Sequence, residues 1–167
     1  MSRAADQAPS ATPVLAAPSP VGLVAVMPDQ AGNLGAILRT AACLRAPVHV
    51  VEPCGFAFSP KAWRRSAMDY AGLAAIHRHA SWAAFLAARG AARLVALTAH
   101  GQASLWEARF APGDLLLLGS ESAGLPAAAL AAADLGLRIP LHPQARSLNI
   151  AVAGAIALAE AQRQLRA

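Results

Sequence analysis

The sequence of 167 residues is poor in several residue types, and each shortage excludes a class of protein. It has two cysteines, Cys43 and Cys54, in no C-x-x-C or other metal-ligand spacing, so neither a disulfide framework nor a cysteine-rich zinc site is expected. This cysteine usage favours the cytoplasm. His77 and His79 have no third ligand nearby in the sequence, and we interpret them as surface or interface histidines. No metal is therefore expected.

Long apolar runs are also missing. No run of about 18 or more apolar residues is free of charges and helix breakers, so we expect no membrane span. The most apolar tract, residues 150–158, leads into Glu160 and Arg163 and is interpreted as a buried helix. Residues 1–20 are rich in Ala, Pro and Ser without the pattern of a signal peptide. We expect a disordered tail there and a single domain over residues 21–167.

Lysine is almost absent, since Lys61 is the only one, although the net charge is +5. The positive charge is therefore carried by arginine, whose planar guanidinium group suits phosphate oxygens and stacks on bases. This balance permits a nucleic-acid partner without identifying one. Hydrophobic residues make up 56% of the chain, which predicts a real core.

Apolar runs alternate with helical patterns along the rest of the sequence. The predicted strands are 21–27, 48–51, 73–76, 93–98, 114–118 and 136–139. The predicted helices are 33–45, 61–68, 82–88, 127–132 and 148–165. This alternation is typical of an α/β fold with a mostly parallel sheet flanked by helices. Ligands of such sheets bind beyond the carboxyl ends of the strands, so we look for chemistry after Thr98, Leu118 and Ile139.

Three segments carry candidate functional residues. The first is Asn33–Arg39, in which Asn33 is a possible helix cap. The second is Gly119–Pro126, a glycine-containing loop whose only acid is Glu121 and whose backbone N–H groups can face a ligand. The third is Ile139–Leu141, followed by Arg146–Asn149, where Ser147 is the expected cap of the last helix. Each segment alone also fits an ordinary capped helix or turn, and neither common nucleotide-binding glycine motif is present.

Together and in this order, the three segments resemble the SpoU branch of the SPOUT methyltransferases. The matching patterns are N-x-G-x-I-x-R, G-x-E-x-x-G-L-P and I-P followed by S-L-N. Glu52–Phe56 and Arg64–Tyr70 are similar to segments of one subgroup, the minimal tRNA (cytidine/uridine wobble-position) 2′-O-methyltransferases. The resemblance covers about residues 21–165.

This resemblance implies a sheet whose C-terminal segment forms a deep trefoil knot, and a homodimer with shared active sites. Such knots are rare, and no periodicity in the sequence would have predicted one. The family binds S-adenosylmethionine, which becomes S-adenosylhomocysteine after transfer. By resemblance, the donor pocket is made by Leu97, Gly119, Ile139, Ser147 and Leu148.

The resemblance also implies the catalytic residues. The family credits the arginine of the first segment, here Arg39, with activating the ribose hydroxyl. Because arginine stays protonated, we favour its stabilising the developing alkoxide in the pocket of the partner chain. Asn33, Glu121 and Asn149 would hold this arrangement. Arg64 and Arg65 are the candidates for tRNA phosphate contacts.

The main expectation is thus methylation of a ribose 2′-hydroxyl in RNA, at the wobble nucleotide of tRNA. One alternative is the same reaction at another position of tRNA or in rRNA. Another is a knotted RNA-binding or assembly factor without catalysis, and a third is an unrelated nucleotide-binding α/β protein.

Overall fold

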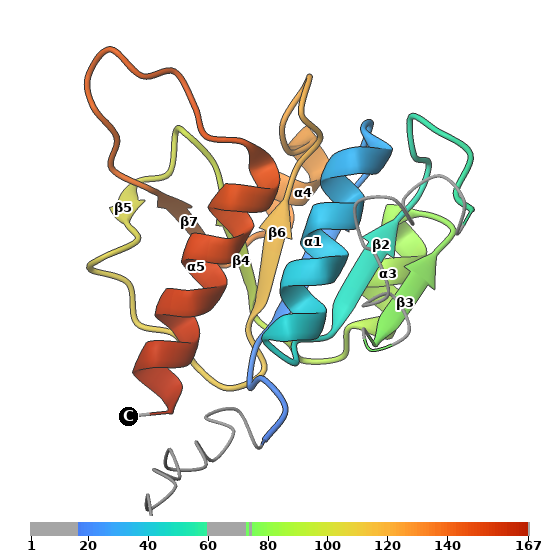
Figure 1. Cartoon of the computed structure of the whole chain (residues 1–167), viewed down its shortest axis with the longest axis horizontal. Coiled ribbons are helices and arrows are strands. Elements are labelled where there is room, and N and C mark those ends of the chain that lie inside the picture. Colours follow the sequence, from blue (N-terminus) through green and yellow to red (C-terminus); the bar gives the residue numbers. More distant parts are fainter. Residues whose placement is uncertain (1–16, 60–72, 74, 167) are drawn as a thin grey trace, which may run out of the picture.

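The computed structural model describes residues 17–59, 73 and 75–166, and in this part of the chain one sheet carries helices on both faces (Figure 1). The strands are β1 (Gly22–Val26), β2 (Val48–Val51), β3 (Ile76–His79), β4 (Leu94–Leu97), β5 (Ala103–Ser104), β6 (Leu115–Leu118) and β7 (Leu135–Arg138). The helices are α1 (Ala31–Cys43), α3 (Trp82–Ala88), α4 (Ala127–Ala132) and α5 (Ile150–Leu165).

The strands run in the order β3-β2-β1-β6-β4-β7-β5, and all paired neighbours are parallel. The predicted parallel sheet flanked by helices is therefore confirmed. The four leucines of β6 lie near the middle of the sheet and are all buried. A continuous apolar strand fits this place because helices cover both faces.

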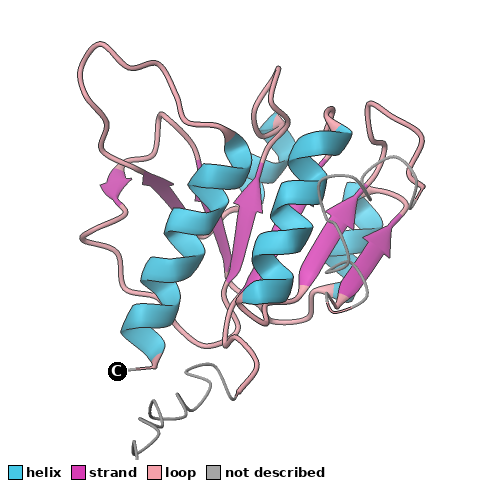
Figure 2. Ribbon diagram, in the orientation of Figure 1, coloured by secondary structure: helices cyan, strands magenta, loops and turns pink. Residues whose placement is uncertain are grey.

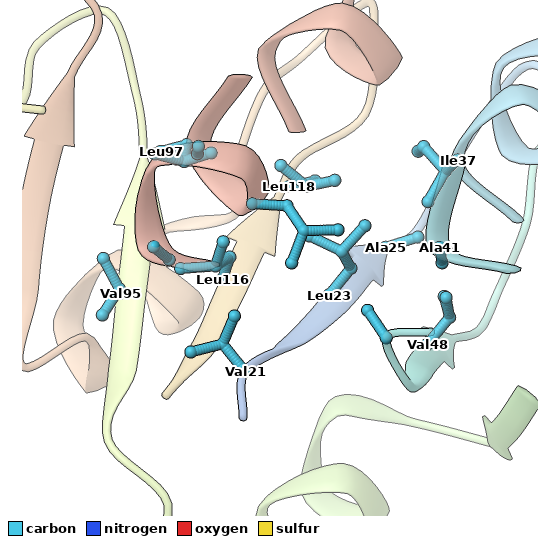
Figure 3. Packing of buried hydrophobic residues seen from close by; sticks show 14 of the residues in the cluster. Val21, Leu23, Ala25, Ile37, Ala41, Val48, Val95, Leu97, Leu116 and Leu118 are labelled. Carbon is cyan, nitrogen blue, oxygen red and sulfur yellow. The ribbon is translucent and has the colours of Figure 1, made fainter. Parts of the chain in front are cut away.

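The core has two layers, one on each face of the sheet. On one face α1 and α5 pack over Leu116 and Leu118, and on the other α3 and α4 pack over Leu115 and Leu117 (Figure 2). Figure 3 shows the first layer, where side chains of β1, β4 and β6 meet those of α1. Each fully buried leucine contributes about 2 kcal/mol to stability.

The two longest described helices begin differently from the prediction. Asn149, and not Ser147, caps α5, because its Oδ1 accepts hydrogen bonds from the backbone N–H groups of Ala151 (2.9 Å) and Val152 (3.3 Å). Asn33 is not a cap either, since α1 begins two residues earlier and follows Gln30, which makes no side-chain capping bond. Both helix starts were misplaced by two residues because the sequence offers several polar residues at each.

Most other element boundaries agree with the prediction to within one or two residues. β2, α3 and α4 coincide with it, whereas β3 lies at Ile76–His79 instead of 73–76. The sequence of β3, I-H-R-H, is too polar to be recognised, and the strand is placed by its backbone pairing with β2. β5 was missed because it has only two residues. The predicted helix over 61–68 lies outside the described residues.

Gly154 of α5 faces β6. A Cβ atom on Gly154 would come within 2.8 Å of Leu118 Cδ1, so a larger residue there would require the Leu118 side chain to move. None of the helices in the described residues is long and apolar enough to cross a membrane.

Three histidines of β2 and β3 form a cluster beside α3. His49 Nδ1 and His79 Nε2 lie 2.9 Å apart, a hydrogen bond in which one ring must donate and the other must accept. His77 stacks on His49 with ring centroids 4.9 Å apart, and Phe85 meets His49 edge-on. Burial, and then the neighbouring histidines, lowers the pKa of His49 to about 4. The cluster therefore favours neutral His49.

The first prediction concerns acid stability. His49 is neutral in the fold but titrates at its ordinary pKa of 6.5 when unfolded. Its contribution is complete above that pH and is lost as the pH falls from 6.5 toward 4. Urea unfolding should show wild type losing about 1–2 kcal/mol more than His49→Gln between pH 7 and pH 4.5, allowing for solvent screening of a half-exposed ring. His142→Gln is the control, and equal losses in wild type and His49→Gln would contradict the assignment.

Candidate functional site

The register of the sheet brings the ends of three strands together at one edge. Ala96 of β4 pairs with Leu117 of β6 on one side and with Gly136 of β7 on the other. The segments that follow these strands therefore start side by side. This is the edge at which ligands bind in parallel α/β sheets.

The loop after β6 is a narrow turn built on glycine. Ser120 and Gly124 exchange two backbone hydrogen bonds of 3.0 and 2.9 Å, and Gly124 has a φ of +71°. A Cβ atom on Gly119 would lie 2.2 Å from the carbonyl carbon of Gly124 and 2.3 Å from the nitrogen of Leu125. Because these neighbours are backbone atoms that cannot rotate away, only glycine fits at position 119.

A cavity of about 610 Å³ opens at this edge. It is lined by all five residues expected to hold the methyl donor, namely Leu97, Gly119, Ile139, Ser147 and Leu148. Three of the four expected catalytic residues, Asn33, Glu121 and Asn149, also line it. Segments far apart in the sequence thus meet around one cavity. The donor-binding and catalytic roles of these residues stay predictions.

The cavity is lined by both apolar and polar side chains. Leu97, Leu125, Leu137 and Ile139 supply apolar surface. Among the polar residues, Asn149 makes two kinds of contact: its Oδ1 caps α5, and its Nδ2 donates a 2.9 Å hydrogen bond to Asn33 Oδ1. The orientation of this amide is therefore determined on both sides, and it ties the start of α5 to the first turn of α1.

Two carboxyl groups meet beside this link. The backbone N–H of Asp29 donates to Glu121 Oε2 (3.2 Å), and the backbone N–H of Glu121 donates to Asp29 Oδ1 (3.3 Å). Hydrogen bonds with Glu121 and Ser122 lower the pKa of Asp29 to about 2. Burial, and then the contact with Asp29, raises the pKa of Glu121, which Asn33 opposes. The two pKa values are therefore shifted in opposite directions, that of Asp29 toward the ionised form and that of Glu121 toward the neutral form.

Three predicted residues lie outside this cavity or outside the described chain. Arg39 is exposed on α1 and is not among the residues that line the cavity of its own chain. Arg64 and Arg65, the candidate phosphate contacts, lie outside the described residues.

Sequence reasoning missed Asp29 and gave no role to His100 or Arg146, although both lie in segments singled out for chemistry. His100 and Arg146 line the cavity, and Asp29 contacts Glu121 from the segment after β1. The rule that ligands bind at strand ends could have found Asp29, because β1 is paired with β6. Over residues 17–59, 73 and 75–166, no group of three or more His, Cys, Asp or Glu side chains is placed to hold a metal ion.

Comparison with known proteins identifies the family. The profile of the SpoU rRNA Methylase family matches residues 20–159, a range that includes every residue assigned to the cavity. The chain belongs to the SpoU rRNA methylase family. The resemblance seen in the three sequence segments is thereby confirmed.

Similar proteins cover nearly the whole SpoU chain. The tRNA (cytidine(34)-2′-O)-methyltransferase of Ancylobacter novellus is 47% identical over 139 residues, which are 82% of this chain and 88% of that protein. A solved structure described as "structural insights into the 2-OH methylation of C/U34 on tRNA" is 45% identical, with a TM-score of 0.82, over 87% of this chain and 96% of that one.

A second solved structure is the SpoU methyltransferase AviRb from Streptomyces viridochromogenes, in complex with AdoMet. It is 31% identical with a TM-score of 0.78, and the match covers 87% of this chain and 58% of AviRb. The SpoU chain thus shares its fold with an enzyme that was solved with the methyl donor.

The second prediction tests the glycine turn. Gly119→Ala forces a methyl group into backbone atoms and should lower the free energy of unfolding by about 2–4 kcal/mol. Gly136→Ala in β7 is the matched control, because its nearest neighbour is an ordinary 3.9 Å away. Chemical denaturation of both variants checks this, and equal stability of the two would show that the turn has another conformation.

Proposed function

We propose that this chain transfers the methyl group of S-adenosylmethionine to a ribose 2′-hydroxyl in RNA, at the wobble nucleotide 34 of tRNA. The observation that carries the proposal is the meeting of eight predicted site residues around one cavity. The tRNA (cytidine(34)-2′-O)-methyltransferase relative supports the choice of substrate. We further propose that residues 21–167 form one methyltransferase domain that works in the cytoplasm.

The cavity fits the proposed donor in size and in the character of its walls. Its volume of about 610 Å³ lies within the range of small-molecule sites. Leu97 and Ile139 offer apolar surface for an adenine ring, and the turn at Gly119 presents backbone groups that can read the edge of that ring. Ser147 and Leu148 would close the pocket from the segment before α5.

The residues of the chain would position the reaction and stabilise charge. The donor, when bound, supplies a methyl group activated by the sulfonium charge. Asn33 and Asn149 hold each other and would fix the place of the sugar relative to the pocket. Arg39 would stabilise the negative charge that develops on the ribose oxygen and on the neighbouring phosphate. Arg64 and Arg65 would contact other phosphates.

We also propose that the active protein is a homodimer. α1 and α5 lie side by side on one face of the molecule (Figure 1). The outward side of α5 carries Val152, 48% exposed, with the partly buried Ile156 and the exposed Ala159. An apolar stripe of this kind favours contact with a second copy of the same face. Such a contact would bring Arg39 of one chain toward the pocket of the other.

A deep trefoil knot at the C-terminal segment is a further part of the proposal. This part is supported by membership of the SpoU family, because the resemblance of the sequence to that family implies a knot.

The proposed function is tested by methylation of tRNA transcripts followed by mass mapping. We expect one methyl group at nucleotide 34, and none on a transcript with a 2′-deoxynucleotide there. Methylation only at another tRNA position or in rRNA would favour the first alternative. Donor binding without methylation of any RNA would favour a non-catalytic RNA-binding factor.

The third prediction concerns Arg39. Arg39→Ala should lower turnover at least about 100-fold, which corresponds to roughly 3 kcal/mol of transition-state stabilisation, and should change donor affinity less than about threefold. Methyl-transfer kinetics and calorimetry measure the two effects. Arg109→Ala, at the opposite edge of the sheet, is the control. Unchanged turnover of Arg39→Ala would refute the role.

The fourth prediction tests the shared site. Arg39→Ala chains mixed with Glu121→Ala chains should recover about one quarter of wild-type turnover, because half of the randomly formed dimers would hold one complete site. Each variant alone should stay inactive. No recovery in a mixture shown to exchange subunits would mean that Arg39 serves its own chain.

A further inference from the structure

Four hydrogen bonds join Asp29 to the turn after β6. Its Oδ2 accepts a 3.1 Å hydrogen bond from the backbone N–H of Ser122 and a hydrogen bond from Ser122 Oγ. Its Oδ1 accepts from the backbone N–H of Glu121 (3.3 Å). Both oxygens thus act as acceptors, which suits an ionised carboxylate because it carries no donor group.

Glu121 faces a different situation. Its Oε2 accepts a 3.2 Å hydrogen bond from the backbone N–H of Asp29, and its Oε1 is buried without a hydrogen-bond partner in the described part of the chain. A buried, unpartnered oxygen costs much more free energy when the carboxyl group is ionised than when it is neutral. Two carboxyl groups in contact cannot both ionise without repulsion. Both arguments place the proton on Glu121.

We propose that Asp29 is a positioning residue that shares one proton with Glu121 and thereby holds the turn Gly119–Leu125 against the start of α1. The pair carries one negative charge, on Asp29, and Glu121 stays a neutral acid at the edge of the cavity. Glu121 is then unsuited to take the ribose proton. This inference rests on the proposed function only for its effect on methylation.

The surroundings of Glu121 act in both directions. Asn33, from α1, lowers the pKa of Glu121, whereas burial and Asp29, which come first in size, raise it. The other charged or titratable side chains that line the cavity are His100 and Arg146. Asp29 follows β1 and Glu121 follows β6, and these strands are paired neighbours. The shared proton therefore links the residues just before Asn33–Arg39 to the turn Gly119–Pro126.

The fifth prediction uses the variant Asp29→Asn. An amide places an NH2 group where one of the two accepting oxygens of Asp29 stands, so one backbone N–H loses its acceptor, and Glu121 loses its ionised partner. Carboxyl ¹³C NMR should show Glu121 titrating well above the ordinary range in wild type and nearer that range in Asp29→Asn. Asp29→Glu, which keeps the charge, should restore part of the shift. Asp134→Asn, which alters a carboxyl group at the opposite edge, should leave it unchanged.

Methylation kinetics give the second readout. Asp29→Asn should lower kcat about tenfold or more, with a KM for tRNA within about twofold, because it disturbs the position of the turn and not RNA binding. An ordinary titration of Glu121 in wild type would overturn the shared proton, and a variant with wild-type kcat would overturn the positioning role. A raised titration in a chain that methylates no RNA would refute the proposed function and support the proton sharing.

Discussion

The parallel pairing of β6, β4 and β7 is the constraint on which the site depends. It brings the segments after these strands to one edge, although they lie about twenty residues apart in sequence. β6 is paired on both sides, with β1 and with β4, and its four leucines are buried in the apolar layers on the two faces of the sheet. The cavity is therefore a consequence of the core.

Polar links then set the shape of that edge. The Asn149–Asn33 bond ties α5 to α1, and Asp29 ties the segment after β1 to the turn after β6. Gly119 permits the turn itself, because a side chain there would strike its own backbone. These contacts fix the loops, which in most proteins are the least constrained parts of the structure.

Sequence reasoning could predict much of this and not all of it. Apolar runs and strand-helix alternation predicted the parallel sheet and most boundaries of the helices and strands, because apolar residues are the ones that the fold buries. The cap of α5 was misplaced, since Ser147 and Asn149 are both suitable capping residues. Only the tertiary contact with Asn33 distinguishes Asn149 from Ser147. β3 was placed too early because its sequence, I-H-R-H, is too polar to be recognised as a strand. Asp29 was missed because its partners lie more than ninety residues away.

The most direct measurement of the central claim is calorimetric titration of the purified chain with S-adenosylmethionine and S-adenosylhomocysteine. If the three strand ends form the donor pocket, each chain should bind one molecule of either compound. Absence of binding by the folded chain would contradict the account, whatever the similarity of its sequence to other methyltransferases.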